Sequence, residues 1–303
     1  MVDSMFDQAR RPQECLTARV GIESVPCVAG FVRMCSDGWD LGWHERNGGN
    51  ASYRMTREDV AACAPYLRDD PTPWEPLAVR TADLGGELFL VTRTGGFMRT
   101  LALDVAAGCG IVEIAPEGDA YRIVWGLVGS GRPTSEFSGH LLMHEARVRA
   151  ARGTGAGVET AVDRVIYHCH PVDLVALTCA VAPDAREITR TLWKMMTECI
   201  MVFPEGVGAV GCLTPGSLAL AEASAREMAQ VRAVVWAHHG LVVSGETFDD
   251  AFGRAHVIVK AAAMYRAARA MCGTAALPYA VTDADLRAIA TDLGLAVREG
   301  YLE

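Results

Sequence analysis

The chain has 303 residues and a mass of 32.5 kDa, and its 28 Lys and Arg against 37 Asp and Glu give a formal net charge of −9 with histidine neutral. This balance argues against a nucleic-acid-binding protein, whose electrostatic footprint is basic, and a chain that is 50% hydrophobic lacks the composition of a disordered one. Because the field of the whole protein repels anions, a phosphorylated substrate would have to be bound by a strongly local positive site.

The ten cysteines are scattered along the chain without any C-x-x-C pair. In a chain of this length, such usage is typical of a reduced, cytoplasmic protein. Charged residues interrupt the N-terminal segment, so we expect no secretory signal peptide. The least polar windows, such as residues 172–182, are about half as long as the ~20 residues that cross a bilayer. We therefore expect a soluble cytoplasmic protein.

The first half of the chain predicts one helix followed by several strands. Residues 1–27 show weak periodicity and are expected to form an N-terminal arm, whereas apolar side chains at helical spacing predict a helix that begins near residue 28. Strands are predicted at residues 51–55, 88–92, 111–115 and 121–127. The proline-rich residues 65–86 are predicted to form a loop.

The second half alternates between helices and strands. Helices are predicted beyond Pro133 and at residues 172–181, 187–199, 218–232, 248–271 and 282–293. Strands are predicted at residues 165–168, 206–212, 234–237 and 241–244. This alternation indicates an α/β fold. Because no internal repeat or low-complexity linker divides the chain, we expect one domain over residues 28–303.

Two histidine motifs are the strongest chemical signals. His168 and His170 flank Cys169 in a predicted strand, where residues i and i+2 point to the same face and two imidazoles can hold one metal ion. An isolated motif of this kind is at least as often a pair of ordinary histidines. However, His238 and His239 follow another apolar strand and offer a third imidazole. Three imidazoles leave a fourth position open, which is typical of a catalytic zinc ion.

Two glutamates, Glu136 and Glu198, are expected near the ends of predicted helices. Glu136 is expected at the start of a helix, where the dipole stabilises a carboxylate, and beside a metal ion it could also be a ligand or a general base. Glu198 is expected toward the end of an apolar helix, where the dipole opposes it, so an ion pair or a function would explain it.

Two turn-rich segments, residues 46–50 and 92–96, could bind a phosphate group. The first offers two asparagine side chains next to two glycines, and the second has a Thr-Gly-Gly run. Ordinary turns have the same composition. Neither segment matches the P-loop or the dinucleotide-binding fingerprint, so a nucleotide site is not favoured.

The motifs of interest stand in a fixed order along the chain: Gly42-Trp43-x-Glu45-Arg46-Asn47-Gly48-Gly49-Asn50, Trp125-Gly126-Leu127, Pro133-Thr134-Ser135-Glu136, His168-Cys169-His170, Leu192-Trp193 through Glu198-Cys199, Val202-Phe203-Pro204-x-Gly206-Val207-Gly208 and His239-Gly240. This order resembles the rhamnulose-1-phosphate aldolase family, within the class II aldolase and adducin-head superfamily. The resemblance extends from about residue 28 to the C-terminal helix and does not include residues 1–27.

The resemblance implies a single three-layer α/β/α domain with a mainly antiparallel central sheet, assembled as a homotetramer with active sites at subunit interfaces. It implies reversible cleavage of L-rhamnulose 1-phosphate, in rhamnose catabolism, to dihydroxyacetone phosphate and L-lactaldehyde. It further implies one Zn²⁺ per subunit, bound by His168, His170 and His239. A retro-aldol step leaves negative charge on oxygen, which a Lewis acid stabilises.

Other residue roles also follow from the resemblance. Glu136 would be the acid/base at the substrate carbon, and Glu198 would act near the aldehyde oxygen. The residues implied to line the phosphate and enediolate site are Asn47, Gly49, Asn50, Thr94, Gly95, Thr134 and Ser135. Whether Glu136 is also a zinc ligand in the absence of substrate stays open.

Three positions depart from the pattern or add to it. Arg93 stands where the family has glycine. A positive φ at this position would therefore be costly. Alternatively, the Arg93 side chain adds a contact to the phosphate group. His238 stands where the family has an apolar aromatic residue, although the register before Gly240 favours His239 as the ligand. His44 could contact substrate, but we expect it on the surface.

Three alternative functions remain at this point. A related aldolase or epimerase would act on L-fuculose 1-phosphate or L-ribulose 5-phosphate. A non-catalytic interaction domain like the adducin head would lack the metal-binding set. A purely structural zinc ion would require a closed site with four ligands.

Overall fold

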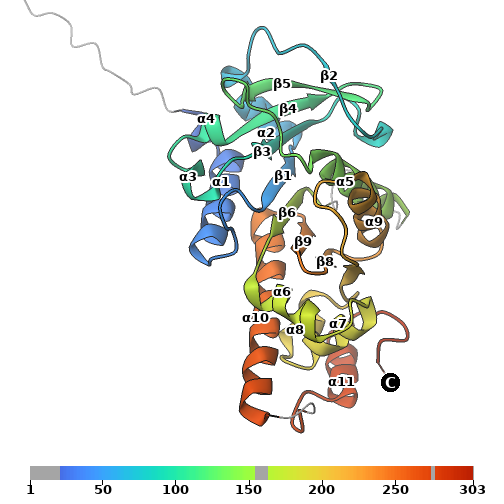
Figure 1. Cartoon of the computed structure of the whole chain (residues 1–303). Helices are drawn as coiled ribbons and strands as arrows, with labels where there is room; N and C mark the ends of the chain where they lie inside the picture. The colour runs from blue at the N-terminus through green and yellow to red at the C-terminus, as the bar shows by residue number, and fades with distance from the viewer. Residues whose placement is uncertain (1–20, 154–162, 274–276, 303) are drawn as a thin grey trace, which may run out of the picture.

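The computed structural model describes residues 21–153, 163–273 and 277–302. In these residues nine strands form one sheet with the spatial order β2-β5-β4-β3-β1-β6-β9-β8-β7 (Figure 1). The strands are β1 (Asn50–Arg54), β2 (Glu75–Pro76), β3 (Leu88–Thr92), β4 (Cys109–Ile114), β5 (Ala120–Gly126), β6 (Val165–Cys169), β7 (Gly208–Val210), β8 (Ala233–Trp236) and β9 (Gly240–Gly245). Neighbouring strands are antiparallel except β7 and β8, which are parallel.

The described α-helices vary from one turn to seven turns in length. They are α1 (Pro26–Asp40), α2 (Arg57–Cys63), α3 (Met98–Leu101), α4 (Val105–Gly108), α5 (Phe137–Gly153), α6 (Val172–Ala180), α7 (Ala185–Trp193), α8 (Glu198–Val202), α9 (Leu218–Met228), α10 (Phe248–Cys272) and α11 (Asp283–Leu293). Short 3-10 turns occur at Ile22–Ser24, Ala64–Tyr66 and Ala82–Leu84.

Helices cover both faces of the sheet, because side chains alternate in direction along each strand. Tyr167 and Cys169 of β6 belong to a hydrophobic core shared with α1, α6 and α10. Ile166 of the same strand belongs to a second core, on the opposite face, shared with α5 and α9. The protein is therefore a three-layer α/β/α domain with a mainly antiparallel sheet, and the predicted fold class is confirmed (Figure 1).

The predicted helix at residues 187–199 is wrong, since the structure has two helices there. α7 ends at Trp193, because the carbonyl oxygen of Lys194 accepts a hydrogen bond from the Val281 amide 3.1 Å away. α8 then begins at Glu198. Glu198 thus lies in the first turn of a helix, where the dipole stabilises it, and not near a helix end as predicted.

The N-terminal part of the described chain is more regular than predicted. α1 begins at Pro26, a residue well suited to the first turn of a helix, and a 3-10 turn precedes it. Residues 1–20 of the predicted arm lie outside the described residues. α2, which the sequence analysis does not predict, begins with a capping box formed by Thr56 and Asp59.

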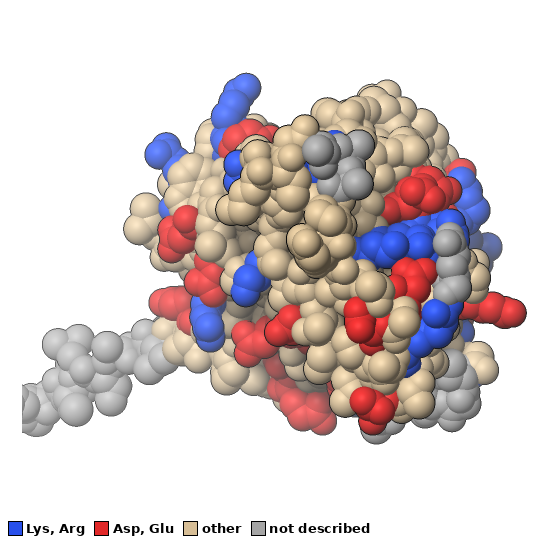
Figure 2. All heavy atoms as spheres, turned by 90° about the horizontal axis from the view of Figure 1, so that it is seen from below, with Lys and Arg blue, Asp and Glu red and all other residues tan. Residues whose placement is uncertain are grey.

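The surface charges are mixed. On the face turned toward the viewer in Figure 2, acidic and basic side chains lie interspersed among uncharged ones. Among the described helices, none combines the length and the apolar composition needed to cross a membrane.

Candidate active site

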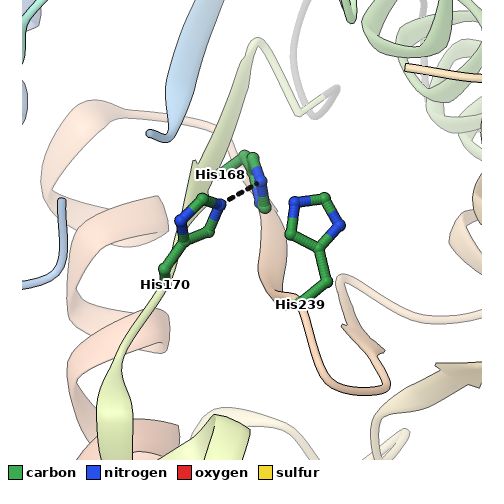
Figure 3. A group of neighbouring side chains, drawn as sticks. All are labelled: His168, His170 and His239. Carbon is green, nitrogen blue, oxygen red and sulfur yellow. Dashed lines mark hydrogen bonds between the residues drawn. The ribbon is translucent and has the colours of Figure 1, made fainter. Parts of the chain in front are cut away.

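Three histidines from two parts of the chain meet at one end of the sheet. His168 lies in β6, His170 follows the end of that strand, and His239 lies in the turn between β8 and β9. Their rings point toward one another (Figure 3), with centroids 4.7 to 5.0 Å apart. One nitrogen of each ring lies within 4.8 Å of the other two.

Gly240 allows β9 to approach β6 closely enough for this cluster to form. A Cβ atom at Gly240 would lie 2.4 Å from the carbonyl oxygen of Cys169 and 2.9 Å from a ring carbon of His170. Contacts under 3.0 Å do not occur in folded proteins without a shift of the backbone or side chain. The Gly240 after His239 is therefore part of what brings the third imidazole to the other two.

The outer nitrogens of two of these imidazoles have partners that fix the ring orientation. His168 Nδ1 lies 2.9 Å from the carbonyl oxygen of Leu241, and His170 Nδ1 lies 2.7 Å from a carboxylate oxygen of Glu45. Since carbonyl and carboxylate oxygens only accept, both Nδ1 atoms carry the hydrogen, and both Nε2 atoms carry a lone pair. Such partners are typical of metal-binding histidines.

The electrostatics of the cluster favour neutral rings at His168 and His239. Burial, reinforced by His170 and His239, holds the pKa of His168 well below its usual range. Burial and the neighbouring His170 lower the pKa of His239 to about 4. The Nε2 atoms of His168 and His170 lie only 3.0 Å apart, and two facing lone pairs at this distance need a proton or a cation between them. The donor set therefore fits a divalent metal ion.

Glu136 lies beside this cluster, immediately before α5. Its Oε2 atom is 3.8 Å from His168 Nε2 and accepts a hydrogen bond of 3.0 Å from the side-chain amide of Asn50. Burial raises the pKa of Glu136, although the hydrogen bond from Asn50 opposes this. A carboxylate with a raised pKa next to three imidazoles is suited to acid/base chemistry.

The Glu136 side chain also lines a cavity of about 110 Å³ between α5, α9 and β8. Ser135 and Ser217 line this cavity together with the apolar residues Leu220 and Trp236. A small molecule next to Glu136 would therefore contact both kinds of group.

The loop before β1 supplies the other residues near the cluster. Gly49 has a φ of +75°, and a Cβ atom there would lie 2.2 Å from His44 Nδ1, so only glycine fits. Asn50 is buried, and its amide is engaged by Glu136 and His140. Asn47 is exposed at the tip of the loop.

The second predicted loop is joined to the segment before Glu136 through backbone hydrogen bonds. The amide of Thr94 donates to the carbonyl oxygen of Arg132, and the amide of Thr134 donates to that of Thr92. Gly95 has a φ of +66°, Thr134 is buried, and Ser135 is exposed. These hydrogen bonds join the loop that contains Thr94 and Gly95 to the segment, with Thr134 and Ser135, that directly precedes Glu136.

His44 and Arg93 have surroundings that differ from those predicted. His44 is 3% exposed, and its Nε2 lies 2.8 Å from the Tyr167 hydroxyl group, so the predicted surface position is wrong. The positive φ in the second loop occurs at Gly95, and Arg93 adopts none. The Arg93 guanidinium instead lies 3.5 Å from the carbonyl oxygen of Ala107.

His238 and Glu198 do not join the cluster. His238 is exposed, with a φ of +62°, and its Nδ1 lies 3.5 Å from the Cys179 sulfur. Glu198 is exposed, and the contact described for its carboxylate is with its neighbour Thr197. Of the two neighbouring histidines, the structure thus brings His239 and not His238 to the other imidazoles.

Four residues of this region had no role predicted from the sequence: Glu45, Ser52, His140 and His144. Glu45 contacts His170, and the other three lie behind Asn50. Glu45 precedes the asparagine-glycine loop, and His140 and His144 have the i, i+4 spacing of one helix face, which is the signal that could have found them.

The model of the Class II Aldolase and Adducin N-terminal domain matches residues 29–266. Among similar proteins, a rhamnulose-1-phosphate aldolase from Mannheimia succiniciproducens is 42% identical over 226 residues, which are 75% of this chain and 80% of that protein. A rhamnulose-1-phosphate aldolase from Listeria monocytogenes is 35% identical over 272 residues, 90% of this chain and 94% of that protein.

Solved structures with the same fold include a sugar-phosphate aldolase from Thermotoga maritima. It superimposes with a TM-score of 0.65 at 24% identity, over 81% of this chain and 95% of that one. The L-fuculose 1-phosphate aldolase from Glaciozyma antarctica PI12 gives a TM-score of 0.53 at 15% identity, over 93% of this chain and 88% of that one.

Proposed function

Since the chain belongs to the Class II Aldolase and Adducin N-terminal domain family and is a class II aldolase, a lyase, we propose that it cleaves L-rhamnulose 1-phosphate reversibly to dihydroxyacetone phosphate and L-lactaldehyde. Two of its relatives with this substrate in their names are 42% and 35% identical to it. The observation that carries the proposal is the cluster of three imidazoles with the Glu136 carboxylate 3.8 Å from His168. The pathway is then rhamnose catabolism.

In this proposal His168, His170 and His239 hold one Zn²⁺ per subunit. When bound, the ion supplies a Lewis acid that stabilises the negative charge developing on oxygen as the carbon–carbon bond breaks. The hydrogen bonds from His168 to Leu241 and from His170 to Glu45 keep the two rings oriented for binding.

Glu136 transfers the proton at carbon. When the carbon–carbon bond breaks, the carbon that keeps the bonding electrons must gain a proton to become the hydroxymethyl group of dihydroxyacetone phosphate, and Glu136 donates it. In the direction of synthesis, its carboxylate removes the same proton. The raised pKa of Glu136 keeps the acid form available, and the Asn50 amide holds the carboxylate at the site.

Glu198 acts near the aldehyde oxygen, where the substrate hydroxyl must lose its proton during cleavage. Because Glu198 is exposed on its own subunit, we place it at the active site of a neighbouring subunit within a homotetramer. The exposed, partly apolar surface around α8, which includes Met201, is the support for an interface there.

The phosphate and enediolate site consists of the two loops that border Glu136. We assign this site to Asn47, Gly49, Asn50, Thr94, Gly95, Thr134 and Ser135. The positive φ values of Gly49 and Gly95 support it, since such loops turn backbone N–H groups toward an anion. A cytoplasmic location completes the proposal, supported by nine free cysteines among the described residues.

The test uses the purified protein and three substrates. We expect about one zinc ion per chain and cleavage of L-rhamnulose 1-phosphate that a chelator abolishes and zinc restores. L-fuculose 1-phosphate and L-ribulose 5-phosphate are the comparison substrates, and faster turnover of either would replace the proposed substrate. Light scattering gives the oligomeric state, for which a tetramer is expected.

A further inference from the structure

Behind Glu136, four more polar side chains continue a single line of hydrogen bonds into the protein. Asn50 Nδ2 lies 3.0 Å from Glu136 Oε2, and Asn50 Oδ1 lies 2.6 Å from His140 Nε2. His140 Nδ1 lies 2.8 Å from the Ser52 hydroxyl, which lies 2.9 Å from His144 Nε2. Every side-chain nitrogen and oxygen atom of these four residues takes part in the line, except Nδ1 of His144.

The backbone explains why these residues meet. Asn50 and Ser52 are separated by two positions in β1 and point to the same face of the sheet. His140 and His144 are separated by four positions in α5 and point to the same side of that helix. All four side chains are buried, Asn50 to 8% exposure and the other three to 0%.

The chemistry of the groups fixes the direction of every hydrogen bond in this line. An ionised Glu136 can only accept, so Asn50 turns its NH₂ group to the carboxylate and its oxygen to His140. His140 must then donate from Nε2, and burial lowers its pKa to about 3, so that the ring is neutral and its Nδ1 accepts from Ser52. Ser52 in turn accepts from His144 Nε2.

The inner end of the line agrees with this direction. His144 Nδ1 is left as an acceptor, and it is buried without a partner among the described residues. Arg54 and Arg164 lie near enough to act on the His144 ring, where their positive charges contribute to lowering its pKa after burial. Positive charge near the ring favours its neutral form, in which one of the two nitrogens keeps a lone pair.

We propose that His140 is a positioning residue for Glu136: by donating to the Asn50 oxygen, it prevents the Asn50 amide from rotating and so holds the Glu136 carboxylate in the position for proton transfer. This inference rests on the acid/base role of Glu136 in the proposed function. Among the described residues, the hydrogen bonds of His140 go to Asn50 and Ser52 and not to the three imidazoles, so we expect the protein to keep its metal when His140 is replaced.

The orientation of the Asn50 amide affects where the Glu136 carboxylate lies. If the Asn50 amide rotated by half a turn, its oxygen would face the carboxylate, and two acceptors would repel each other. Glu136 would then move or take up a proton. A displacement of about 1 Å at a reacting group costs about 100-fold in rate, so a residue two hydrogen bonds away can affect turnover strongly.

The experiment compares His140→Leu with His140→Gln and with Leu141→Ala. Leucine removes the donor, whereas the glutamine amide can donate to Asn50 and accept from Ser52. Leu141 is the next residue of α5 and is fully buried, so Leu141→Ala controls for a damaged core. For His140→Leu we expect kcat to fall about 10- to 100-fold with little change in KM. His140→Gln should recover most of the lost kcat, and Leu141→Ala should keep wild-type kcat.

A lost kcat that glutamine does not restore, or an unchanged kcat in His140→Leu, overturns the inference. Ser52→Ala is the second variant in case His140→Leu does not fold, and a several-fold fall in kcat at wild-type KM is expected from it. Crystal structures of the variants give a readout that does not need activity. The Asn50–Glu136 contact of 3.0 Å should persist in His140→Gln and be lost in His140→Leu.

This readout separates the two proposals. A wild-type protein that cleaves none of the three sugar phosphates contradicts the proposed function. The contact between Asn50 and Glu136 in the crystal structures then still decides the positioning role of His140, because persistence of that contact in His140→Leu contradicts it.

Discussion

Asn50 and His168 are directly opposite each other in the antiparallel ladder between β1 and β6. Directly opposed residues point to the same face of a sheet, so the amide and the imidazole enter the site side by side. Glu136 contacts both, with distances of 3.0 Å to Asn50 and 3.8 Å to His168. The register of two central strands thus sets the distance between the three imidazoles and the Glu136 carboxylate.

Replacing Glu136 by glutamine should remove the acid/base group and leave the fold and the metal site intact. We expect Glu136→Gln to retain zinc and to lose about 100-fold or more in kcat, which is the usual contribution of such a group. Glu117→Gln, at an exposed turn, is the control and should have wild-type activity. Activity near wild type in Glu136→Gln would remove Glu136 from the mechanism.

The two neighbouring histidines of the β8–β9 turn give a matched pair of variants. His239→Ala should lower the zinc content of the purified protein, because one of three imidazole ligands is missing. His238→Ala should leave it unchanged, since His238 contacts Cys179 and not the cluster. Metal analysis after dialysis measures both. Equal zinc retention in the two variants would contradict the proposed ligand set.

Glu45 should matter for metal affinity without being a ligand. Its carboxylate accepts from His170 Nδ1, and although burial acts in the opposite direction, this hydrogen bond lowers the pKa of Glu45. We expect Glu45→Gln to weaken zinc binding about 10- to 100-fold, the usual effect of losing such a partner. Competition with a chelator of known affinity measures this, and an unchanged affinity would assign Glu45 to the loop structure alone.

Replacing Gly49 or Gly95 by alanine should reduce stability for different reasons, a steric clash in addition to backbone conformation at Gly49 and backbone conformation alone at Gly95. Both have positive φ, but a Cβ atom at Gly49 would lie 2.2 Å from His44, whereas a Cβ atom at Gly95 would have open space around it among the described residues. Gly95→Ala should lower the free energy of unfolding by about 1 kcal/mol, the cost of the backbone conformation. Gly49→Ala should cost about 3 kcal/mol or more, because a clash adds to that conformational cost. Urea unfolding measures both, and equal losses would show that the clash is relieved.

His44 should contribute to acid sensitivity. Burial lowers its pKa to about 4 from the ordinary 6.5, so between these values the unfolded chain binds a proton that the folded chain does not. Above pH 6.5 the His44 ring is neutral in both states and does not lower the free energy of unfolding. Between pH 6.5 and about 4 it lowers this free energy by up to about 1.4 kcal/mol for each pH unit of acidification. Urea unfolding of His44→Gln at several pH values should show a shallower fall than wild type. Loss of metal in acid affects both proteins, so an identical fall would contradict the pKa of His44.

The order of helices and strands was largely predictable because apolar periodicity is strong in this chain. The strand predicted at residues 88–92 agrees with β3, and the helix predicted at residues 282–293 agrees with α11, which begins with a capping box at Thr282. The break between α7 and α8 was not predictable, because it depends on a hydrogen bond from Val281, which is remote in sequence.

The candidate site was predictable only in part. The two histidine motifs indicate His168, His170 and His239, because a second motif after another apolar strand offers the third imidazole. The line behind Glu136 was not found, because the sequence predicts a helix beyond Pro133 but does not show that His140 and His144 lie on its buried face. Burial of His44 depends on its packing against Tyr167, which sequence periodicity does not reveal.

The three imidazoles come from the end of β6 and from the turn between β8 and β9, and this has a consequence for how the chain folds. The ligands are correctly spaced only after β6 has paired with β9, which requires closing a long loop. Metal capture should therefore come late in folding, after the barrier. A loaded protein would then refold at the rate of the metal-free chain but unfold more slowly, so that zinc would protect it kinetically.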